Sequence, residues 1–338
     1  MGKYLVRRMI WMFFVLFLVS LITFILMHQV PGGPFDRERS LPQVVIENRE
    51  ARYHLDDPLW KQYVDYVHNI SIPRITTEKQ DVTTLNDYLI NVDLSFLGEH
   101  TAFRWMNFGP SLTQRSRTVN DIFRENLPVS AQLGLAAVVV ACVIGIPLGT
   151  LAALNRNSAV DYLGMGVAIL GVSVPIVVMG PLLRYIFGVQ LRVLPPTGWG
   201  SFEQLIMPAF ALGFASSALL ARLTRASLLQ VLDEDYIRTA HSKGLRKITV
   251  ITRHAMKNAM IPVVTVLGPL LAALMTGTFV TEQVFAINGM GKFFIVSVTN
   301  RDYPVVMGTI LLYAASLVVA NFFVDLTYAW LDPRIRFD

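Results

Sequence analysis

The stretch DYIRTAHSKGLRKITVITRHAMKNAMIP, residues 235–262, is a dense basic run between two strongly apolar stretches. The chain around it has 338 residues, of which 53% are hydrophobic and 16% are charged. Its mean hydropathy is +0.49. Because this composition is too apolar for a soluble chain of this length, it predicts a protein that lies in a lipid bilayer. The bases flank apolar spans, so membrane topology explains the net charge of +5 and nucleic acid is not expected as a partner.

Six stretches approach the roughly 20 helical residues that cross a hydrocarbon core about 30 Å thick. The third carries Arg184 near one end and the fifth carries Glu282 near its end, and we expect the Arg184 side chain to reach toward the interface. The sequence therefore predicts an all-α, polytopic membrane protein with six transmembrane helices, at 9–30, 129–154, 162–188, 205–221, 261–285 and 304–323.

Lysine and arginine in the short connections predict the orientation, because cytoplasmic loops carry an excess of them. One side receives the bases at both chain ends and between the second and third spans: Lys3, Arg7, Arg8, Arg156, Arg334 and Arg336. The connection at 222–260 adds Arg222, Arg225, Arg238, Lys243, Arg246, Lys247, Arg253 and Lys257 to that side. The opposite short connections hold Arg192, Lys292 and Arg301. Both termini and the basic connection are therefore expected in the cytoplasm.

The chain is expected to divide into four parts. Within residues 1–30, the apolar stretch 9–30 exceeds the usual 7–15 residues of a secretion signal and no small-residue cleavage site follows, so an uncleaved anchor helix is predicted. Residues 31–126 would form an external lobe that leans acidic. Residues 127–326 would form a five-helix core that includes the cytoplasmic loop 222–260, and residues 327–338 a cytoplasmic tail.

One helix can be predicted inside the lobe. Asp57 is expected to cap it and Pro58 to open it, and apolar residues follow at helical spacing, namely Leu59, Tyr63, Tyr66 and Val67. Such a helix needs a partner surface. Residues 71–90 show no sustained period, so the sequence does not predict their structure, and it does not show whether residues 31–126 fold alone.

Two amphipathic helices joined at a glycine are predicted in the basic connection. Apolar residues recur at three- and four-residue spacing from Leu228 to Ala240 and again from Leu245 to Ala259. Gly244 lies between the two patterns, where the end of a helix takes a positive φ that glycine accepts. A pair of this kind suits either anionic lipid headgroups or a cytoplasmic protein, and the pattern alone does not separate the two.

No catalytic site is predicted. In NGMGKFF, at 288–294, Ala286 stands where a P-loop needs glycine and Phe293 where it needs Ser or Thr. The single Cys142 supports neither a disulfide framework nor a thiolate metal site. No Gly-x-Ser-x-Gly occurs, and no His-Glu-x-x-His pattern connects His28, His54, His68, His100, His241 and His254. The chain is therefore expected to be no enzyme and to bind no metal or cofactor.

Prolines and polar residues within the spans are candidates for a transport path. Five prolines are predicted to interrupt the helical ladder and produce kinks: Pro147, Pro175, Pro181, Pro208 and Pro269. The polar candidates are Ser173, Thr276, Thr278, Thr281 and Glu282. Glu282 could meet a peptide amine or a gate partner, or it could pair with Lys292 or Arg301 at headgroup level.

Several motifs together resemble permeases of ABC importers, in the form found in the dipeptide and oligopeptide subfamily. DYIRTA at 235–240, followed by Gly244 and the Ile261–Pro262 pair, is similar to the cytoplasmic "EAA" loop, although Arg238 and Thr239 stand where the general motif has Glu and Ala. The other matches occur in the family's order: HQVPGGP at 28–34, LDDPLWKQY at 55–63, LPPTGWGS from 194, NGMG from 288, RDYPVV from 301 and DPRIR near the end. Residues 71–90 look like an insertion.

The resemblance implies an ABC importer permease fold in a bacterial or archaeal cytoplasmic membrane. It implies a second homologous permease, two cytoplasmic ATP-binding subunits or domains that hold ATP and magnesium, and an external substrate-binding protein. The ATPase subunit would receive the coupling loop, through Asp235, Tyr236, Ile237, Arg238, Thr239, Ala240, Gly244 and Leu245. The large apolar residues of this set could instead pack the elbow on itself.

The resemblance implies dipeptides or oligopeptides as cargo, but permeases for nickel, glutathione and opines share the motifs. The sequence does not separate these cargoes, nor does it identify the individual partners. A secondary transporter is the alternative of another class. It would need carboxylates for a coupling ion at mid-membrane, and the predicted span interiors contain none.

Overall fold

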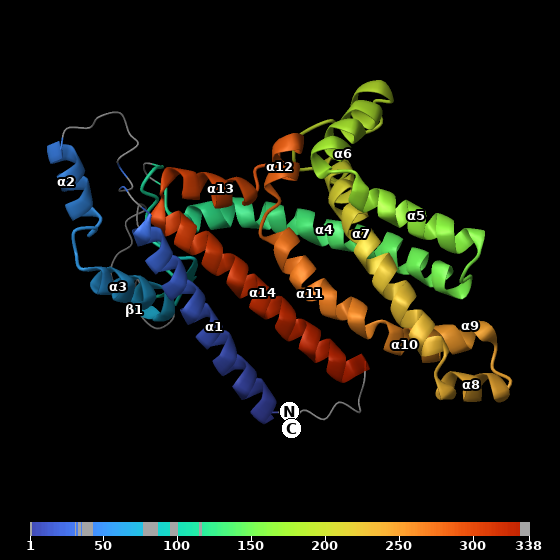
Figure 1. Cartoon of the computed structure of the whole chain (residues 1–338). Coiled ribbons are helices and arrows are strands. Elements are labelled where there is room, and N and C mark those ends of the chain that lie inside the picture. Colours follow the sequence, from blue (N-terminus) through green and yellow to red (C-terminus); the bar gives the residue numbers. More distant parts are fainter. Residues whose placement is uncertain are drawn as a thin grey trace. The chain divides into compact units, whose positions relative to one another are not determined.

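The computed structural model describes residues 2–30, 32, 35, 43–76, 87–94, 101–114 and 117–331, and Figure 1 shows their course. The chain forms two compact units. A core unit contains Met1–Trp11, Val129–Gly291 and Ala315–Asp338, and a lobe unit contains Met12–Pro128 and Lys292–Ala314. Three long helices are shared between the units, namely α1 (Gly2–Gln29), α4 (Val119–Leu154) and α14 (Tyr303–Leu331), and α13 (Gly291–Asn300) has its first residue in the core unit.

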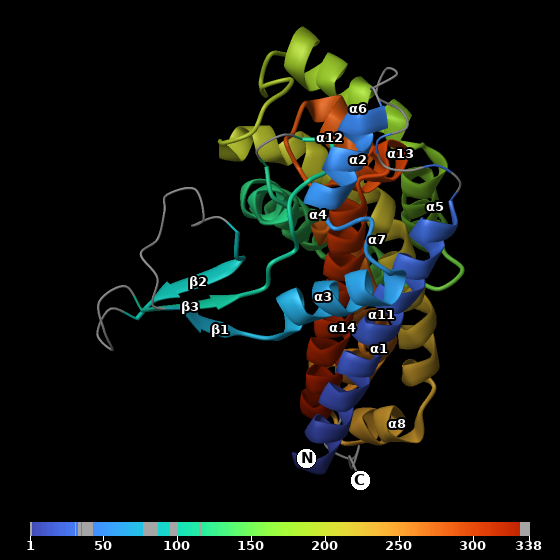
Figure 2. The same ribbon diagram turned by 90° about the vertical axis from the view of Figure 1, so that its left-hand side faces the viewer.

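The core unit is built from helices. Besides its parts of α1, α4 and α14, it contains α5 (Ala159–Ser173), α6 (Ile176–Leu183), the π-helical η2 (Arg184–Gln190), α7 (Phe202–Leu232), α8 (Asp235–Ser242), α9 (Lys247–Thr249), the π-helical η3 (Val250–Ala255), α10 (Met256–Ala259), α11 (Ile261–Met275) and α12 (Phe279–Phe285). The first turns of α1 and the last turns of α14 lie at the same end of this unit as α8 (Figure 2). An ion pair between Arg8 and Asp325 joins those two helices there.

The described helices confirm a mostly helical, polytopic membrane protein. Four of them are long and apolar enough to cross a bilayer, and up to six spans result if each bent pair counts as one. The four lie within α1, α4, α7 and α14. The bent pairs are 159–173 with 176–190, at 99°, and 247–259 with 261–275, at 52°.

The stretches predicted as single spans at 162–188 and 261–285 are each broken, and the first break lies at Pro175, where an interruption was predicted. Pro175 lies at the first break with an extended ψ of 143°, since its ring cannot continue the ladder of the preceding helix. The second break follows Met275, and Gly277 has a φ of +127° that L residues rarely adopt. A side chain on Gly277 would also place its Cβ 2.5 Å from the backbone nitrogen of Gly291.

The helices continue past the other four prolines. Pro147 lies inside α4, Pro208 inside α7 and Pro269 inside α11. Pro181 lies inside α6, one turn before the π-helical η2. Among the five prolines, only Pro175 lies at a bend between two helices, the 99° bend between 159–173 and 176–190.

The contact between α4 and α7 is made by backbone as well as side chains. A Cβ on Gly145 would lie 2.6 Å from the carbonyl oxygen of Ser217, and one on Gly149 would lie 2.3 Å from that of Ala221. Leu220 and Ala221 are fully buried in this contact region. Small residues of this kind let membrane helices approach closely, so dispersion contacts hold the pair together.

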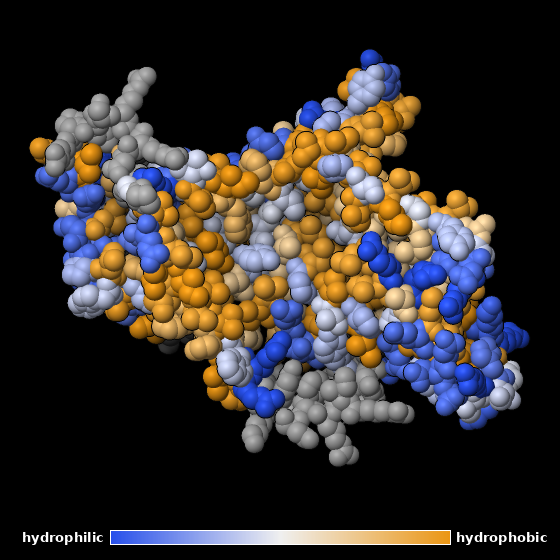
Figure 3. Space-filling view, in the orientation of Figure 1, coloured by the Kyte–Doolittle hydropathy of each residue, from blue (hydrophilic) through white to orange (hydrophobic). Residues whose placement is uncertain are grey.

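The surface of the core unit separates by polarity. Exposed hydrophobic side chains, among them Val177, Val178 and Leu182, cover α6, where a lipid or protein neighbour is expected. Figure 3 shows hydrophilic residues gathered over α8 and α9, at the lower right. The strongly charged end of the unit is therefore the end that carries the basic connection.

The lobe unit combines short helices with a small sheet. Its elements are the larger part of α1, α2 (Gln43–Arg52), α3 (Leu59–Ser71), β1 (Arg74–Thr76), β2 (Ile90–Asp93), β3 (Ala102–Trp105), α13 (Gly291–Asn300) and the start of α14. The strands pair antiparallel in the order β1-β3-β2, with Ile75 opposite Phe103 and Val92 opposite the same residue. Residues 77–86, in the stretch without a predictable period, lie outside the described residues.

The predicted helix of the lobe is α3, and its start differs by one residue. Pro58 is the N-cap and Leu59 the first helical residue, so Asp57 does not cap the helix. Its carboxylate instead accepts from Lys61 Nζ at 2.9 Å. The partner surface is α1, because Tyr63 bonds to Ser20 at 2.9 Å and its ring lies 5.2 Å from that of Phe24.

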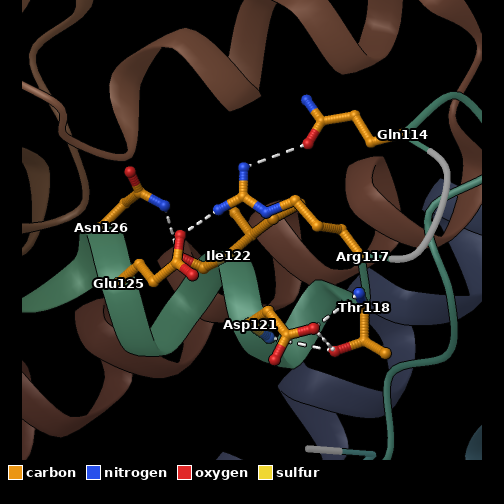
Figure 4. A network of polar contacts seen from close by, with 7 residues as sticks. All are labelled: Gln114, Arg117, Thr118, Asp121, Ile122, Glu125 and Asn126. Atoms are coloured by element: carbon orange, nitrogen blue, oxygen red, sulfur yellow. Dashed lines mark hydrogen bonds and ion pairs between the residues drawn. The ribbon is translucent and has the colours of Figure 1, made fainter. Parts of the chain in front are cut away.

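A polar network fixes the beginning of α4 (Figure 4). The hydroxyl of Thr118 accepts from the backbone N–H of Asp121, and the carboxylate of Asp121 accepts from the backbone N–H of Thr118 at 2.9 Å. This reciprocal pair caps donors that the first turn leaves open. One turn further on, Arg117 forms an ion pair with Glu125. The helix therefore begins at a defined residue.

Asp302 holds the connection before α4 against the start of α14. Its carboxylate is 2% exposed and accepts from the hydroxyl of Ser111, from Leu112 N at 3.1 Å and from Thr113 Oγ1 at 2.8 Å. A buried carboxylate is tolerated when donors surround it, as they do here.

We expect Asp302→Ala to lower the free energy of unfolding by about 2–3 kcal/mol, because it leaves buried donors of residues 111–113 without an acceptor. Thermal unfolding of the purified protein measures this loss. The exposed neighbour Asn300→Ala is the control. Equal melting temperatures for the two variants would contradict the role of Asp302.

Candidate coupling surface and transport path

The basic connection folds into an elbow of short helices. The predicted single helix from Leu228 to Ala240 was wrong, because α7 ends at Leu232 and α8 begins at Asp235. Glu234 has an extended conformation, with φ −71° and ψ 146°, and this lets α8 change direction. After α8, Gly244 has the predicted positive φ, +75°, and a helical stretch follows from Lys247 to Ala259.

Two of the predicted docking residues are buried inside the chain. Ile237 is 2% exposed and Ala240 is 6% exposed. They pack in one cluster with Ala153 of α4, Leu228 of α7 and residues of η3 and α10, namely Val250, Ala255 and Ala259. These two side chains therefore fix α8 on the core unit, which is the packing alternative that the sequence left open for the large apolar residues.

The other predicted docking residues are exposed: Asp235, Tyr236, Arg238, Thr239, Gly244 and Leu245. Tyr236 is partly anchored, because its hydroxyl accepts from Asn258 Nδ2 at 2.7 Å and so ties α8 to α10. Thr239 Oγ1 donates to the carbonyl of Asp235 at 2.9 Å. The result is a short helix with a supported inner side and a free outer side.

An ion pair that the sequence did not predict joins α5 to α7 within the same unit. Arg225 donates to both carboxylate oxygens of Asp161, each at 2.7 Å. Asp161 is 2% exposed and also accepts from the backbone N–H of Asn157 at 3.0 Å. A two-point contact of this geometry fixes both distance and orientation. It lies two helical turns before the end of α7, and α8 follows that end.

Glu282 is the centre of the second candidate region. It is 3% exposed, and its carboxylate accepts from Ser130 Oγ at 2.8 Å, Thr278 N at 3.0 Å and Gly291 N at 2.8 Å. Ser130 Oγ in turn accepts from Met290 N at 2.8 Å. The carboxylate thus closes the loop 278–291 on itself and attaches it to α4. No sequence signal indicated Ser130.

The predicted path residues are only partly brought together. Thr278 and Thr281 share the loop with Glu282, and their hydroxyl oxygens are buried without a hydrogen-bond partner among the described residues. Thr276 is buried, but its hydroxyl donates to Ala272 of its own helix at 2.8 Å. Ser173 does not join this network; it is exposed and donates to Ile169 within α5.

Arg184 also contacts α12, the short helix that contains Glu282. Its guanidinium donates to the carbonyl oxygen of Val284 in α12. The guanidinium therefore has a partner inside the protein, a carbonyl near the end of α12, and its reach toward the interface stays a prediction. Where the chain is described, no group of three or more His, Cys, Asp or Glu residues could hold a metal ion.

Both parts of the chain are similar to known membrane components of transport systems. Residues 145–337 match the family described as "Binding-protein-dependent transport system inner membrane component". Residues 1–85 match the family of the N-terminal part of such membrane components.

Several curated relatives are similar over their whole length. The dipeptide transport system permease protein DppB of Bacillus subtilis is 41% identical, over 99% of this chain and 98% of that protein. The oligopeptide transport system permease protein OppB of Haemophilus influenzae is 38% identical, over 100% of both. Among solved structures, the MetNI methionine ABC transporter has a TM-score of 0.49 at 15% identity, covering 62% of this chain and 96% of that one.

We expect the elbow to depend on the conformation of Gly244 and not on space around it. No atom lies within 4 Å of a Cβ built there, so Gly244→Ala adds only the cost of positive φ, roughly 1 kcal/mol. Hydrogen exchange of the α8 amides should become roughly fivefold faster. Gly244→Asn is the matched control, since asparagine tolerates this φ. Equal exchange in both variants would refute the role of the conformation.

Replacing the carboxylate of Glu282 should loosen the loop 278–291, because this carboxylate binds backbone N–H groups at both ends of the loop. We expect Glu282→Gln to cost roughly 2 kcal/mol, because an amide NH₂ would then face a buried N–H donor. Thermal unfolding measures the loss, and hydrogen exchange over residues 278–291 locates it. Gln283→Ala, at the exposed neighbouring position, is the control. Unchanged exchange in Glu282→Gln would contradict the assignment.

Proposed function

Because the chain belongs to the family of binding-protein-dependent transport system inner membrane components, as a transmembrane permease subunit of an ABC importer, we propose that its cargo is a dipeptide or oligopeptide. Full-length similarity to proteins named as dipeptide and oligopeptide permeases supports this cargo. The proposal includes a bacterial or archaeal cytoplasmic membrane as the location. The basic face at α8 would be on the cytoplasmic side.

The proposal requires partners. One chain with up to six spans would form half of the path, and a second homologous permease would form the other half. Two cytoplasmic ATP-binding subunits or domains would hold ATP and magnesium, and an external substrate-binding protein would deliver the cargo. This chain would contribute the path and the coupling, not the hydrolysis.

The observation that carries the proposal is the division of α8 into an outer and an inner side. The exposed Tyr236, Arg238, Thr239 and Leu245 would dock on the ATP-binding subunit, together with Asp235 and Gly244. Ile237 and Ala240 would act from behind, because their burial joins α8 to the core unit.

A displacement of α8 would then reach the spanning helices through short contacts. The buried cluster connects α8 to Leu228 of α7 and Ala153 of α4. The ion pair between Arg225 and Asp161 carries the displacement from α7 to α5. Since well-packed interiors deform little, these helices would move together.

The path residues are part of the same proposal. Thr276, Thr278 and Thr281 would lie beside the path, and Glu282 would be a positioning residue that fixes their loop. Ser173, exposed at the end of α5, would face the path or lipid. The buried hydroxyls of Thr278 and Thr281 would exchange partners when the loop moves.

Two threonines allow a matched test of docking. Thr239 and Thr252 are both exposed, and each hydroxyl donates to the carbonyl four residues earlier. Thr239→Lys should lower dipeptide uptake at least tenfold, because it places a long charged side chain at the proposed contact. Thr252→Lys, on η3 and outside the docking set, should retain uptake. The measurement uses the complete transporter in liposomes, with dipeptide-stimulated ATP hydrolysis recorded in parallel.

The same experiment separates docking from cargo. Equal uptake by the two lysine variants would refute the docking face. Stimulation of hydrolysis by nickel or glutathione, but by no peptide, would refute the cargo and leave the docking face standing.

A further inference from the structure

The lobe unit contains a cavity of about 530 Å³. Its walls come from the end of α1, the connection between α2 and α3, α3 itself, the connection that follows β3 and the start of α14. This volume lies within the range of roughly 300–1,000 Å³ that is usual for small-molecule sites. Nothing in the coupling or path proposal uses this cavity.

One wall of the cavity is apolar. It is formed by Phe24 and Met27 of α1, Phe108, Pro304 and Met307. Phe24, Phe108 and Met307 are buried residues of the lobe, so this wall is a fixed part of its packing. A ligand with an apolar moiety would gain about 25 cal/mol for each Å² of apolar surface that leaves water.

The polar wall of the cavity has hydrogen-bond donors that could bind an acceptor on a ligand. The hydroxyl of Tyr66 is buried and has no hydrogen-bond partner among the described residues, although a buried hydroxyl without one is costly. Burial raises the pKa of Tyr66, so the hydroxyl keeps its proton and can donate it. The acceptor oxygen of Asn107 already takes the backbone N–H of Gly109 at 2.8 Å, which leaves the NH₂ of that side chain to donate.

Charge in the cavity also favours an anion. Two guanidinium groups, of Arg52 and Arg74, line it against one carboxylate, that of Asp65. Arg74 is held in place by Asn69 Oδ1 at 2.8 Å and by His68 Nδ1 at 3.0 Å. Arg52 is exposed and forms no ion pair with any residue that the structure describes. The guanidinium of Arg52 can therefore pair with an anionic group of a ligand.

We propose that this cavity binds a small amphipathic anion, with its carboxylate or phosphate group at Arg52, Tyr66 and Asn107 and its apolar part against Phe24 and Met307. Charge-assisted hydrogen bonds of this kind give both affinity and orientation. The C-terminal carboxylate of a short peptide and the headgroup of an anionic phospholipid share this chemistry. The proposal stands independently of the docking face at α8.

The test uses the complete purified transporter in detergent, without added lipid, and isothermal titration calorimetry. One probe is N-acetyl-Ala-Phe, compared with its C-terminal amide. The other is dihexanoyl phosphatidylglycerol, compared with dihexanoyl phosphatidylcholine. We expect at least one anion to bind more tightly than its matched neutral or zwitterionic partner.

Variants assign the binding to the cavity. Arg52→Gln should weaken the anion roughly tenfold or more, and Tyr66→Phe should weaken it by severalfold, because each removes one donor. Lys61→Gln is the control, since it removes a positive charge from α3 but does not line the cavity. Arg52 and Lys61 are both exposed, so neither change disturbs the packing of the lobe.

The affinities of the two anions for the variants decide the proposal and the source of the ligand. Preference for the peptide acid that Arg52→Gln abolishes supports the proposal with a peptide as the source. The same pattern for phosphatidylglycerol supports it with a lipid as the source. Absence of binding by both anions, or affinities that Arg52→Gln and Lys61→Gln change equally, would overturn it.

Discussion

Inside a bilayer no water is available to backbone N–H and C=O groups, so every break in a spanning helix needs a partner from the protein. Glu282 meets this requirement after α11, where its carboxylate accepts from the backbone at both ends of the loop 278–291. Ser130 attaches that loop to α4, and Arg184 satisfies the carbonyl of Val284 at the far end of α12. The turn after α11 is therefore held by charged side chains that take the place of the missing ladder bonds.

The elbow at 235–259 is held mainly by apolar packing and not by a buried carboxylate. Its inner side is held by close packing, since Ile237 and Ala240 are buried with residues of α4 and α7. Its outer side is polar and exposed, and Gly244 allows the chain to return because glycine accepts a φ of +75°. A partner that grips the outer side would therefore act on the spanning helices themselves and not on a mobile loop.

The sequence predicts the features that repeat along the chain, and it misses those that depend on folding. Apolar run length indicates the spans, and spacing indicates the glycine of the elbow. Pro175 indicated an interruption, but an apolar run looks the same whether or not it is broken, so the turn at Gly277 was not predicted. The bonds from Ser130 to Glu282 and from Arg225 to Asp161 join residues 152 and 64 positions apart, and no local pattern records such pairs. The strands of the lobe, three or four residues each, are too short for a period to appear.

The glycines of α4 limit how this chain can vary during evolution. At Gly145 and Gly149 the carbonyl oxygens of α7 occupy the space that even one methyl group would need. Only glycine therefore fits at these two positions. Positions on the outer faces of the same helices can exchange among apolar residues of many sizes. Lineages of this permease should consequently diverge fastest where lipid touches them and slowest along a narrow line inside the protein, whatever their cargo becomes.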